Sequence, residues 1–341
     1  MNVVVCPSDQ TGCGKYRMIW PAEALQAQGA NVTIQKRPRI LVNQAIKPAE
    51  IQDVLIQDAD VIVFQRPASY QIAQMIPILH KKGIKVVIDM DDDLSTIHPI
   101  NPSYSFYRPD INPHRNWELA QKACDMADMV TVTTPALADK YGKHGRVAVI
   151  PNCIPDSYLK IESTKNNMVT VGWPGWVATH PEDLQVTHGA INEALVKQNA
   201  RFMVIGDKRA FDKLGIKNRA PHIFHEGVEM DVYPETVSQL DIGIVPLADT
   251  PFNHAKSWLK ALEYAALGVA PVVSPTPDNM RMVNAGAAYV ASSPKIWRDS
   301  LRSLINNEGE RTTLAKSARN FASIWTIEAN AWRWWAVWNQ T

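Results

Sequence analysis

The sequence lacks the features of a secreted or membrane-spanning protein. Its 341 residues include only four cysteines, scattered and without a CxxC pair, which fits a reducing compartment better than a disulfide framework. No stretch of about 18 or more apolar residues is present, so we expect no transmembrane segment. The first ten residues, MNVVVCPSDQ, do not resemble a signal peptide. We therefore expect a soluble, cytoplasmic protein.

The sequence also lacks an excess of charge of one sign. It contains 35 basic and 34 acidic residues, which gives a formal net charge of +1. Proteins that bind nucleic acid over a large surface usually carry a marked positive charge. We therefore do not expect nucleic acid as a partner.

Short apolar runs rich in valine and isoleucine alternate with helical patterns along the whole chain. Such runs are typical of strands buried on both faces of a parallel sheet. In the first half they are Val3–Cys6, Val32–Ile34, Val61–Phe64, Val86–Ile88, Val130–Val132 and Val147–Ile150. In the second half they are Val169–Gly172, Phe202–Ile205, His222–Phe224, Ile242–Val245, Ala270–Val273 and Ala288–Val290.

This alternation predicts two doubly wound α/β domains with crevices at the C-terminal ends of their strands. We place the first domain at residues 1–151, an irregular polar linker at 152–167 and the second domain at 168–322. The terminal segment, 323–341, is rich in tryptophan. It is expected to form a helix that crosses back and packs on the first domain.

A turn with two glycines follows the first predicted strand. Gly12 and Gly14 would let a ligand approach the backbone closely, and a simple tight turn explains them equally well. The segment is neither a P-loop nor a dinucleotide fingerprint. Tyr16 stands where a P-loop needs Ser or Thr, and Arg17 stands where the fingerprint needs a third glycine.

A group of carboxylates follows the fourth predicted strand. Packed together, these side chains would repel, so at least one pKa would be raised unless a cation or N–H groups compensate. Metal ligation, proton abstraction and orientation of an acceptor are alternative roles, and a helix N-terminus would explain only part of the group. We expect a functional site here. The acids are Asp89, Asp91, Asp92 and Asp93, and His98 follows them in a loop rich in tyrosine and proline.

The predicted strands of the second domain also end in polar residues. Thr179 or His180 is expected to cap a helix that begins at Pro181, with Glu182 and Asp183 in its first turn. A ligand contact is an equally good role for His180, since it follows a strand end. Other candidates at strand ends are Trp176, Gly206, Asp207, Lys208 and Pro246.

The most informative stretch is residues 253–277, NHAKSWLKALEYAALGVAPVVSPTP. It predicts a loop, an amphipathic helix from about Lys256 to Leu267 and a short buried strand. Lys256, Lys260 and Glu263 would share one face of that helix. A helix N-terminus flanked by lysines binds anions, phosphates especially, although a surface helix with supporting ion pairs would carry the same charges.

Taken together, these segments resemble the retaining GT-B glycosyltransferases, in particular the group-1, family 4-like enzymes. The resemblance covers nearly the whole chain. It implies a GT-B fold: two Rossmann-like domains facing a central cleft, with a C-terminal helix crossing back to the first. It rests on Gly12–Arg17, VVIDMDDDL, TVTTPALADKYGKHGRVAVIPNCIP, VGWPGWVATHPEDL, IGDK and KSWLKALEYAALGVAPVVS.

The resemblance also implies the roles of particular residues. The family has a Glu-x7-Glu motif whose second glutamate holds the ribose of the nucleotide, and Glu263 stands at that position. The first glutamate would fall at Ala255, which leaves the donor sugar to Asn253, His254 and Lys256. The nucleotide-sugar site implied is Gly12, Gly14, Trp176, His180, Gly206, Asp207, Lys208, Pro246, Asn253, Lys256, Ser257, Lys260 and Glu263. The catalytic residues implied are Asp91, Asp92, His98 and Lys256.

The activity implied is transfer of a sugar from a UDP- or GDP-sugar to an acceptor hydroxyl of a glycan, a protein or another molecule. Retention is implied, and a divalent metal is not expected. Three alternatives stay open: an epimerase-like nucleotide-sugar enzyme, a DNA-modifying glucosyltransferase and a non-catalytic nucleotide-sugar-binding protein. The alanine at position 255, where the motif has its first glutamate, keeps the non-catalytic binding protein open. A local group of basic residues keeps the second open: Lys36, Arg37, Arg39 and Lys47.

Overall fold

The computed structural model describes residues 1–45, 50–108, 116–163, 167–216 and 220–340. The chain divides into two compact units. Unit 1 consists of Met1–Pro99, Ser103–Asn152 and Ile327–Thr341, and unit 2 consists of Ile100–Pro102 and Cys153–Thr326. Lys47 of the basic group and residues 164–166 of the expected linker lie outside the described residues.

Unit 1 is built around a six-stranded parallel sheet in the order β2-β1-β5-β6-β7-β8. The central strands are buried along their whole length apart from the first residue of β6, which explains their continuous runs of valine and isoleucine. The strands are β1 (Val3–Cys6), β2 (Val32–Ile34), β5 (Val61–Gln65), β6 (Lys85–Met90), β7 (Met129–Val132) and β8 (Val147–Val149).

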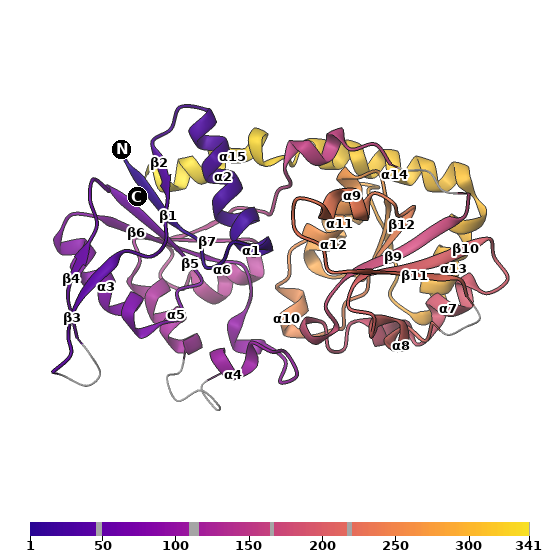
Figure 1. The fold of residues 1–341 in the computed structure, drawn as a ribbon, viewed down its shortest axis with the longest axis horizontal. Helices are drawn as coiled ribbons and strands as arrows, with labels where there is room; N and C mark the ends of the chain where they lie inside the picture. The colour runs from indigo at the N-terminus through magenta and orange to yellow at the C-terminus, as the bar shows by residue number, and fades with distance from the viewer. Residues whose placement is uncertain (46–49, 109–115, 164–166, 217–219, 341) are drawn as a thin grey trace. The chain divides into compact units, whose positions relative to one another are not determined.

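Helices cover both faces of this sheet (Figure 1). The first crossover carries α1 (Gly12–Gly14), a π-helical turn (Lys15–Ile19) and α2 (Trp20–Ala27). The crossovers from β5 to β8 run the other way, so their helices lie on the opposite face. These are α3 (Tyr70–Lys81), α5 (Asn116–Met126) and α6 (Pro135–Tyr141), and the short helix α4 spans Tyr104–Tyr107.

The C-terminal helix α15 (Ile327–Trp338) belongs to unit 1 and packs on α2. Two of its tryptophans, Trp334 and Trp338, are fully buried, and Trp334 Nε1 donates a hydrogen bond of 3.1 Å to the carbonyl of Arg17. The tryptophan stripe is therefore a packing surface. Residues 323–326 precede this helix and lie in unit 2.

An antiparallel ribbon of β3 (Arg39–Asn43) and β4 (Glu50–Leu55) follows β2. The sequence did not predict it, because its strands are mostly exposed or half-buried and form no continuous buried run. Leu41 and Leu55 are about half exposed. Lys36, Arg37 and Arg39 lie at its beginning.

Unit 2 contains a second six-stranded parallel sheet in the order β11-β10-β9-β12-β13-β14. Its strands are β9 (Val169–Gly175), β10 (Ala200–Gly206), β11 (His222–Glu226), β12 (Ile242–Val245), β13 (Ala270–Val273) and β14 (Tyr289–Val290). Its helices are α7 (Ala190–Leu195), α8 (Ala210–Lys213), α9 (Tyr233–Val237), α10 (Pro251–His254), α11 (Leu259–Ala266), α12 (Pro277–Asn284), α13 (Pro294–Asn306) and α14 (Glu308–Ser323).

The helix expected from Lys256 begins later, at Leu259. The segment before it forms α10, which is capped by Thr250. Trp258 then fixes the start of α11: its N–H donates to Asp278 Oδ2 at 2.8 Å, and the guanidinium of Arg281 lies 3.9 Å from its ring centroid. Lys256 therefore lies in the connection between two helices and does not share a helix face with Lys260.

The helix expected at Pro181 is also absent from the described structure. A turn follows His180, and the next helical segment is a 3-10 turn at Leu184–Thr187. Asp183 is buried instead of lying in an exposed first turn. Its carboxylate bonds to His180, Ala248 and Asn253 and does not lie in the first turn of a helix.

Each sheet reverses its strand order once, between β1 and β5 in unit 1 and between β9 and β12 in unit 2. At this switch point the loops that follow the two neighbouring strands run in opposite directions, which opens a crevice between them. Open α/β sheets bind ligands in such crevices. No helix in the described parts of the chain has the length and apolar character needed to cross a membrane.

Candidate functional site

The switch point of unit 2 brings together a histidine, two lysines and two carboxylates. His180 and Asp183 follow β9, whereas Lys256 precedes α11 and Lys260 and Glu263 lie on it. Lys260 Nζ donates a hydrogen bond to the carbonyl of Pro174 in β9, so the two segments are in direct contact. The sequence places these residues far apart, and the strand order of the sheet unites them.

Asp183 joins the two loops. Its Oδ2 lies 2.7 Å from His180 Nδ1, and its Oδ1 accepts hydrogen bonds from the N–H of Ala248 at 2.9 Å and from Asn253 Nδ2 at 2.6 Å. Burial raises the pKa of the Asp183 carboxyl, but the bonds to His180 and Ala248 outweigh burial and the pKa is lowered. A buried charged carboxylate thus holds His180 and Asn253 in place.

His180 is half-buried, and its pKa is lowered. Burial is the largest cause, the hydrogen bond with Asp183 opposes it, and the charges of Lys256 and Lys260 lower the pKa further. The ring lies edge-on to Trp173, with centroids 5.8 Å apart. Because the ordinary pKa of histidine is near 6.5, this lowering of the pKa favours the neutral ring.

Lys260 has a strongly lowered pKa. Its Nζ donates a hydrogen bond to the carbonyl of Pro174 and lies 5.7 Å from the ring centroid of Trp173. Burial lowers its pKa to about 8, Glu263 opposes this shift, and Lys256 adds to it. Lys260 is thus mostly charged at neutral pH and titrates just above it.

Glu263 presents a buried carboxylate whose orientation is fixed by a tyrosine. Its side chain is 6 % exposed, and Oε2 accepts a hydrogen bond of 2.9 Å from the hydroxyl of Tyr233 in α9. Burial, and then the charge of Glu263, raise the pKa of Tyr233, so the phenol remains a donor. Sequence reasoning missed Tyr233, since it belongs to another helix and to no motif.

Gly206 and Asp207, at the end of β10, have structural roles in the loops that follow β9 and β10. Gly206 has a φ of +112°, and a Cβ there would lie 2.6 Å from the carbonyl oxygen of Gly175, so a side chain does not fit. Asp207 accepts hydrogen bonds from the N–H of Val177 at 3.1 Å and from Arg209 Nη2 at 2.6 Å. Its carboxylate is therefore already bound within the protein.

The other predicted residues of unit 2 differ in exposure. Trp176 is 57 % exposed and lies next to Gly227, where an added Cβ would come within 3.0 Å of its ring. Lys208 is exposed, and Pro246 is buried at the end of β12. Ser257 is half-buried between α10 and α11. Trp176 thus offers an aromatic face at a strand end, beside the loop that carries His180.

In unit 1, Arg66 contacts residues of both loops at the switch point. This residue directly follows β5 and has a φ of +45°, an unusual value for a side chain other than glycine. Its guanidinium contacts Asp91, lies 2.7 Å from Asp92 Oδ2 and donates to Cys13 Sγ at 3.2 Å. The loop after β1 and the acids after β6 therefore meet at one arginine, which the sequence analysis did not single out.

The other two acids of the Asp89–Asp93 group are held inside unit 1. Asp89 is fully buried and forms an ion pair of 2.7 Å with Arg17. Asp93 accepts a hydrogen bond from the N–H of Ser95 at 3.0 Å. Each of the four carboxylates thus has a cation or an N–H group beside it, which compensates the repulsion expected from their spacing.

The two glycines after β1 have different surroundings. A Cβ on Gly14 would lie 1.9 Å from the carbonyl oxygen of Asp9, so the turn itself requires this glycine. Gly12 has open space at the Cβ position, so the turn does not require a glycine there. His98 lies in the same unit, half-buried in the loop after Thr96.

Within the described residues, no three His, Cys, Asp or Glu side chains lie close enough together to coordinate a metal ion. The cysteines Cys6, Cys13, Cys124 and Cys153 are free thiols. Transfer without a metal stays a prediction of the sequence.

The chain was compared with known proteins. No family model and no curated protein matches it, but solved structures do. HepE of Anabaena in complex with UDP-glucose is 12 % identical with a TM-score of 0.69, and all of both chains is covered.

Two further solved structures are similar. Sucrose-phosphate synthase of Thermosynechococcus elongatus is 12 % identical with a TM-score of 0.65, and 100 % of this chain and 99 % of that chain are covered. WaaG, a glycosyltransferase involved in lipopolysaccharide biosynthesis, is 15 % identical with a TM-score of 0.61, and 99 % of this chain and 100 % of that chain are covered. At this identity the likeness concerns the fold. The chain has the two-domain, Rossmann-like GT-B fold.

Proposed function

We propose that the protein is a glycosyltransferase that moves a sugar from a nucleotide-diphosphate sugar to an acceptor hydroxyl. The observation that carries this proposal is the cluster of His180, Lys256, Lys260 and Glu263 at the switch point of unit 2. Lysines in a partly desolvated site attract a diphosphate more strongly than they would in water. A fixed carboxylate is suited to accept hydrogen bonds from a ribose diol.

The proposed chemistry depends on charge that develops on the leaving group. As the glycosidic bond breaks, the nucleoside diphosphate gains negative charge, and cations that are already in place stabilise it. Lys256 and Lys260 supply these cations. His180, held by Asp183, adds a ring that can take up a proton beside the phosphates. We propose that transfer proceeds with retention and needs no divalent metal.

The proposed role of unit 1 is to hold the acceptor. Arg66 pairs with both Asp91 and Asp92 and fixes the position of the two carboxylates. Carboxylates held in this way are suited to orient a hydroxyl by accepting its hydrogen bond. This favours orientation of the acceptor among the alternatives that the sequence left open.

Changing Asp91 to asparagine should lower turnover by about tenfold, the value of one hydrogen bond to a charged group. Binding of UDP should stay within about twofold of wild type, because Asp91 lies in unit 1. Steady-state kinetics and calorimetry on the same preparations test both parts. Asp89→Asn is a poor control because it breaks a buried ion pair, so Asp125→Asn, which alters an exposed acid on α5, serves instead. Equal turnover in Asp91→Asn and wild type would show that Asp91 does not orient the acceptor.

UDP affinity should fall about tenfold as the pH is raised from about 7 to about 9. Below its pKa of about 8, Lys260 is charged and attracts the diphosphate, and above that pKa it is neutral. The change corresponds to one charge-assisted hydrogen bond. Calorimetric titrations across this pH range measure it. Lys260→Met should bind UDP more weakly at about pH 7 and show little further loss. A parallel fall in the variant would assign the pH dependence to another group.

The proposal is tested by incubating the protein with UDP- and GDP-sugars and separating the products. Release of the nucleoside diphosphate together with transfer to an acceptor, or to water, supports it. An isomerised donor would favour the epimerase-like alternative, and binding without turnover would favour a binding protein. HepE was solved in complexes with UDP, with UDP and glucose, and with UDP-glucose, which makes UDP-glucose a sensible first donor.

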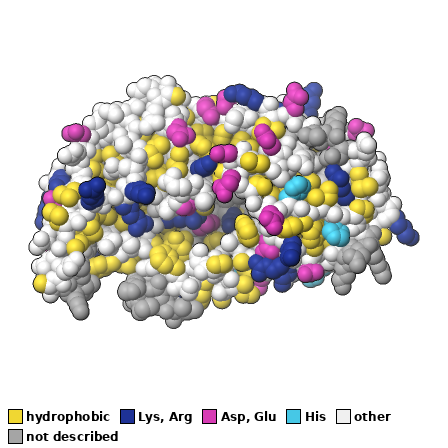
Figure 2. All heavy atoms as spheres, in the orientation of Figure 1, with side chains coloured by type: hydrophobic (Ala, Val, Ile, Leu, Met, Phe, Trp, Pro, Cys, Tyr) yellow, Lys and Arg dark blue, Asp and Glu magenta, His cyan; other side chains and the backbone are white. Residues whose placement is uncertain are grey.

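A DNA acceptor receives little support from the surface charge. On the face drawn in Figure 2, basic and acidic side chains are interspersed, without one extended basic area. Binding to DNA that falls steeply with added salt would still reveal such an acceptor.

A further inference from the structure

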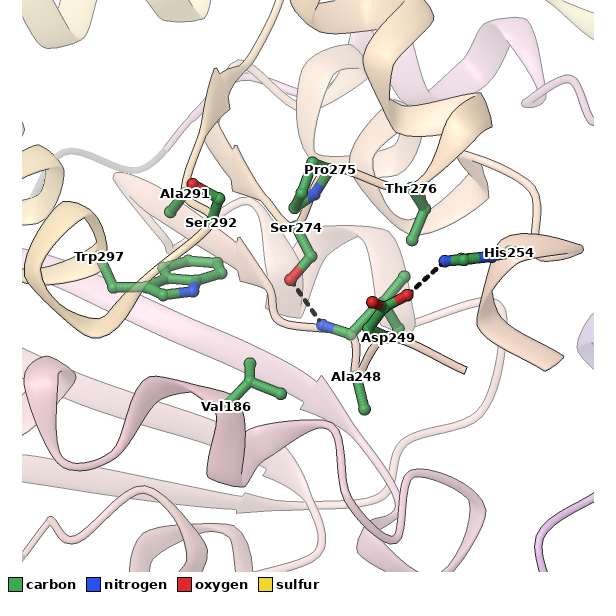
Figure 3. Close-up of a pocket in the computed structure, with 11 residues that line it drawn as sticks. Val186, Ala248, Asp249, His254, Ser274, Pro275, Thr276, Ala291, Ser292 and Trp297 are labelled. Atoms are coloured by element: carbon green, nitrogen blue, oxygen red, sulfur yellow. Dashed lines mark hydrogen bonds and ion pairs between the residues drawn. The ribbon is translucent and has the colours of Figure 1, made fainter. Parts of the chain in front are cut away.

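The sheet of unit 2 ends in two edges that differ in length and surroundings. At one edge β14 is only two residues long, and a pocket of about 290 Å³ lies at the C-terminal ends of β12, β13 and β14 (Figure 3). Part of its wall belongs to the core, since Trp297 is 1 % exposed and the buried Ser274 accepts a hydrogen bond from the N–H of Leu247. At the other edge, β11 is five residues long, and alternate residues along it are exposed.

The outer side of β11 carries backbone groups that are free to bond to another strand. The N–H of Phe202 in β10 donates a hydrogen bond of 2.9 Å to the carbonyl of Pro221. Because alternate residues of a strand direct their N–H and C=O groups to the same side, Pro221 and every second residue after it face β10. The residues between them face away from β10: His222, Phe224 and Glu226. Within the described part of the chain, β10 is the only strand that bonds to β11.

The side chains of the same three residues form a self-complementary pattern. Successive side chains of a strand alternate between the two faces of a sheet, so His222, Phe224 and Glu226 share one face, and all three are exposed. Suppose that two copies of β11 lie antiparallel with Phe224 opposite Phe224. His222 of each copy then lies opposite Glu226 of the other. Aromatic pairs and pairs of opposite charge are both stabilising when they lie directly opposite each other on neighbouring strands.

The backbone is satisfied by the same register. In an antiparallel pair, opposite residues at alternate positions exchange two hydrogen bonds. With Phe224 at the centre, every outward-facing group of β11 meets an outward-facing group of the other copy. A shift by one residue would place outward-facing groups opposite residues that are already bonded to β10. The backbone and the side chains therefore favour one register.

Local contacts orient His222 for such a pair. Its ring centroid lies 4.9 Å from that of Phe211 in α8, and its Nδ1 donates a hydrogen bond of 3.1 Å to the carbonyl of Ala220. A protonated imidazole has a second donor at Nε2. A carboxylate close to the ring favours this protonated form, and Glu226 of the other copy would supply it.

We propose that β11 binds β11 of a second copy of this chain, antiparallel and centred on Phe224, in a two-fold symmetric dimer. Exposed edge strands are templates for such pairing unless their side chains prevent it, and the charges on this edge attract each other across the two-fold axis. The inference does not rest on the proposed function, because β11 contributes no residue to the cluster of His180, Lys256, Lys260 and Glu263.

Three variants and a control test the inference. Phe224→Lys replaces the central aromatic pair with two opposing positive charges. Glu226→Lys places a lysine opposite His222 of the other copy. Combining His222→Glu with Glu226→Lys restores opposite charges in both outer pairs, with their order reversed. Glu162→Lys makes the same change of charge at an exposed residue outside β11 and serves as the control. Sedimentation velocity over a wide range of protein concentration gives the dissociation constant of each dimer, and thermal unfolding checks that each variant is folded.

Wild type and Glu162→Lys should dimerise with the same dissociation constant. Phe224→Lys and Glu226→Lys should each raise it at least about tenfold, since symmetry makes every change act in both copies. The double variant should recover most of the loss in Glu226→Lys, which a residue needed only for folding would not do.

The inference is overturned if the wild type stays monomeric at every concentration. It is also overturned if Phe224→Lys and Glu226→Lys dimerise as the wild type does. Failure of the double variant to recover would overturn the register centred on Phe224. None of these outcomes depends on turnover or on UDP binding, so the proposed function is tested separately.

Discussion

Turnover of the donor should fall by about 10²–10³-fold when Lys256 is changed to methionine. Removing one preorganised donor to the charge of a transition state costs about this much in other enzymes. Lys256 lies between α10 and α11, where its charge reaches both His180 and Asp183. Methionine keeps most of the length of the side chain and removes the charge, so packing against Phe252, whose ring centroid lies 4.5 Å from Nζ, is largely retained.

The loss should appear mainly in kcat. Charge on the leaving group is greater in the transition state than in the bound donor, and interactions made only there raise kcat without tightening ground-state binding. Steady-state kinetics with UDP-glucose separates the two constants. Lys316→Met, on the exposed side of α14, is the matched control and should behave as wild type. An unchanged kcat in Lys256→Met, with only KM raised, would assign Lys256 to ground-state binding.

UDP affinity should fall by about 10- to 100-fold when Glu263 is changed to glutamine. The carboxylate would accept hydrogen bonds from the ribose hydroxyls, and each hydrogen bond to a charged group contributes about 1.5–3 kcal/mol. Glutamine has the same shape, so the contact with Tyr233 and the packing of α11 are kept. Calorimetry with UDP measures the change in affinity.

Tyr233→Phe is the control for Glu263→Gln. It removes the hydroxyl that bonds Glu263 Oε2 and leaves the carboxylate in place. We expect a much smaller loss of UDP affinity in this variant. Thermal unfolding of each protein separates local from global effects, since a carboxylate needed only for stability would lower Tm and leave the affinity of the remaining folded protein unchanged. That outcome would show that Glu263 does not bind the nucleotide.

The sequence predicts the fold well because its signals are local and repeated. The valine runs at Val3–Cys6 and Val169–Gly172 predict buried parallel strands, and β1 and β9 lie there. The tryptophans of the last helix predict packing on the first domain, and Trp334 contacts Arg17. The ribbon of β3 and β4 escapes prediction, since most of its residues are exposed or half-buried.

The site is less predictable because its geometry depends on contacts between distant segments. The sequence places Asp183 in the first turn of a helix, yet it is buried and bonded to Asn253, seventy residues away. Arg66 belongs to no motif and becomes visible only when β5 and β6 bring it beside Asp91 and Asp92. Such partners are found by asking which residues follow adjacent strands, and this requires the strand order.

The start of α11 illustrates the same limit of local patterns. Periodicity extends the helix back to Lys256, because Lys256 and Lys260 have helical spacing. The bond from the N–H of Trp258 to Asp278, on the following helix, determines where α11 begins. Asp278 lies twenty residues after Trp258. A window used to detect helical periodicity around Lys256 does not reach it.

The central claim is that the cluster at the switch point of unit 2 binds the diphosphate of a nucleotide. Calorimetric titration of the wild type and of a Lys256→Met, Lys260→Met double variant with UDP and with GDP tests it most directly. We predict saturable one-to-one binding of at least one nucleotide to the wild type and a loss of at least about 100-fold in the double variant, from two charge-assisted contacts. Equal affinity of the double variant and the wild type, or no binding of either nucleotide to the wild type, would contradict the account.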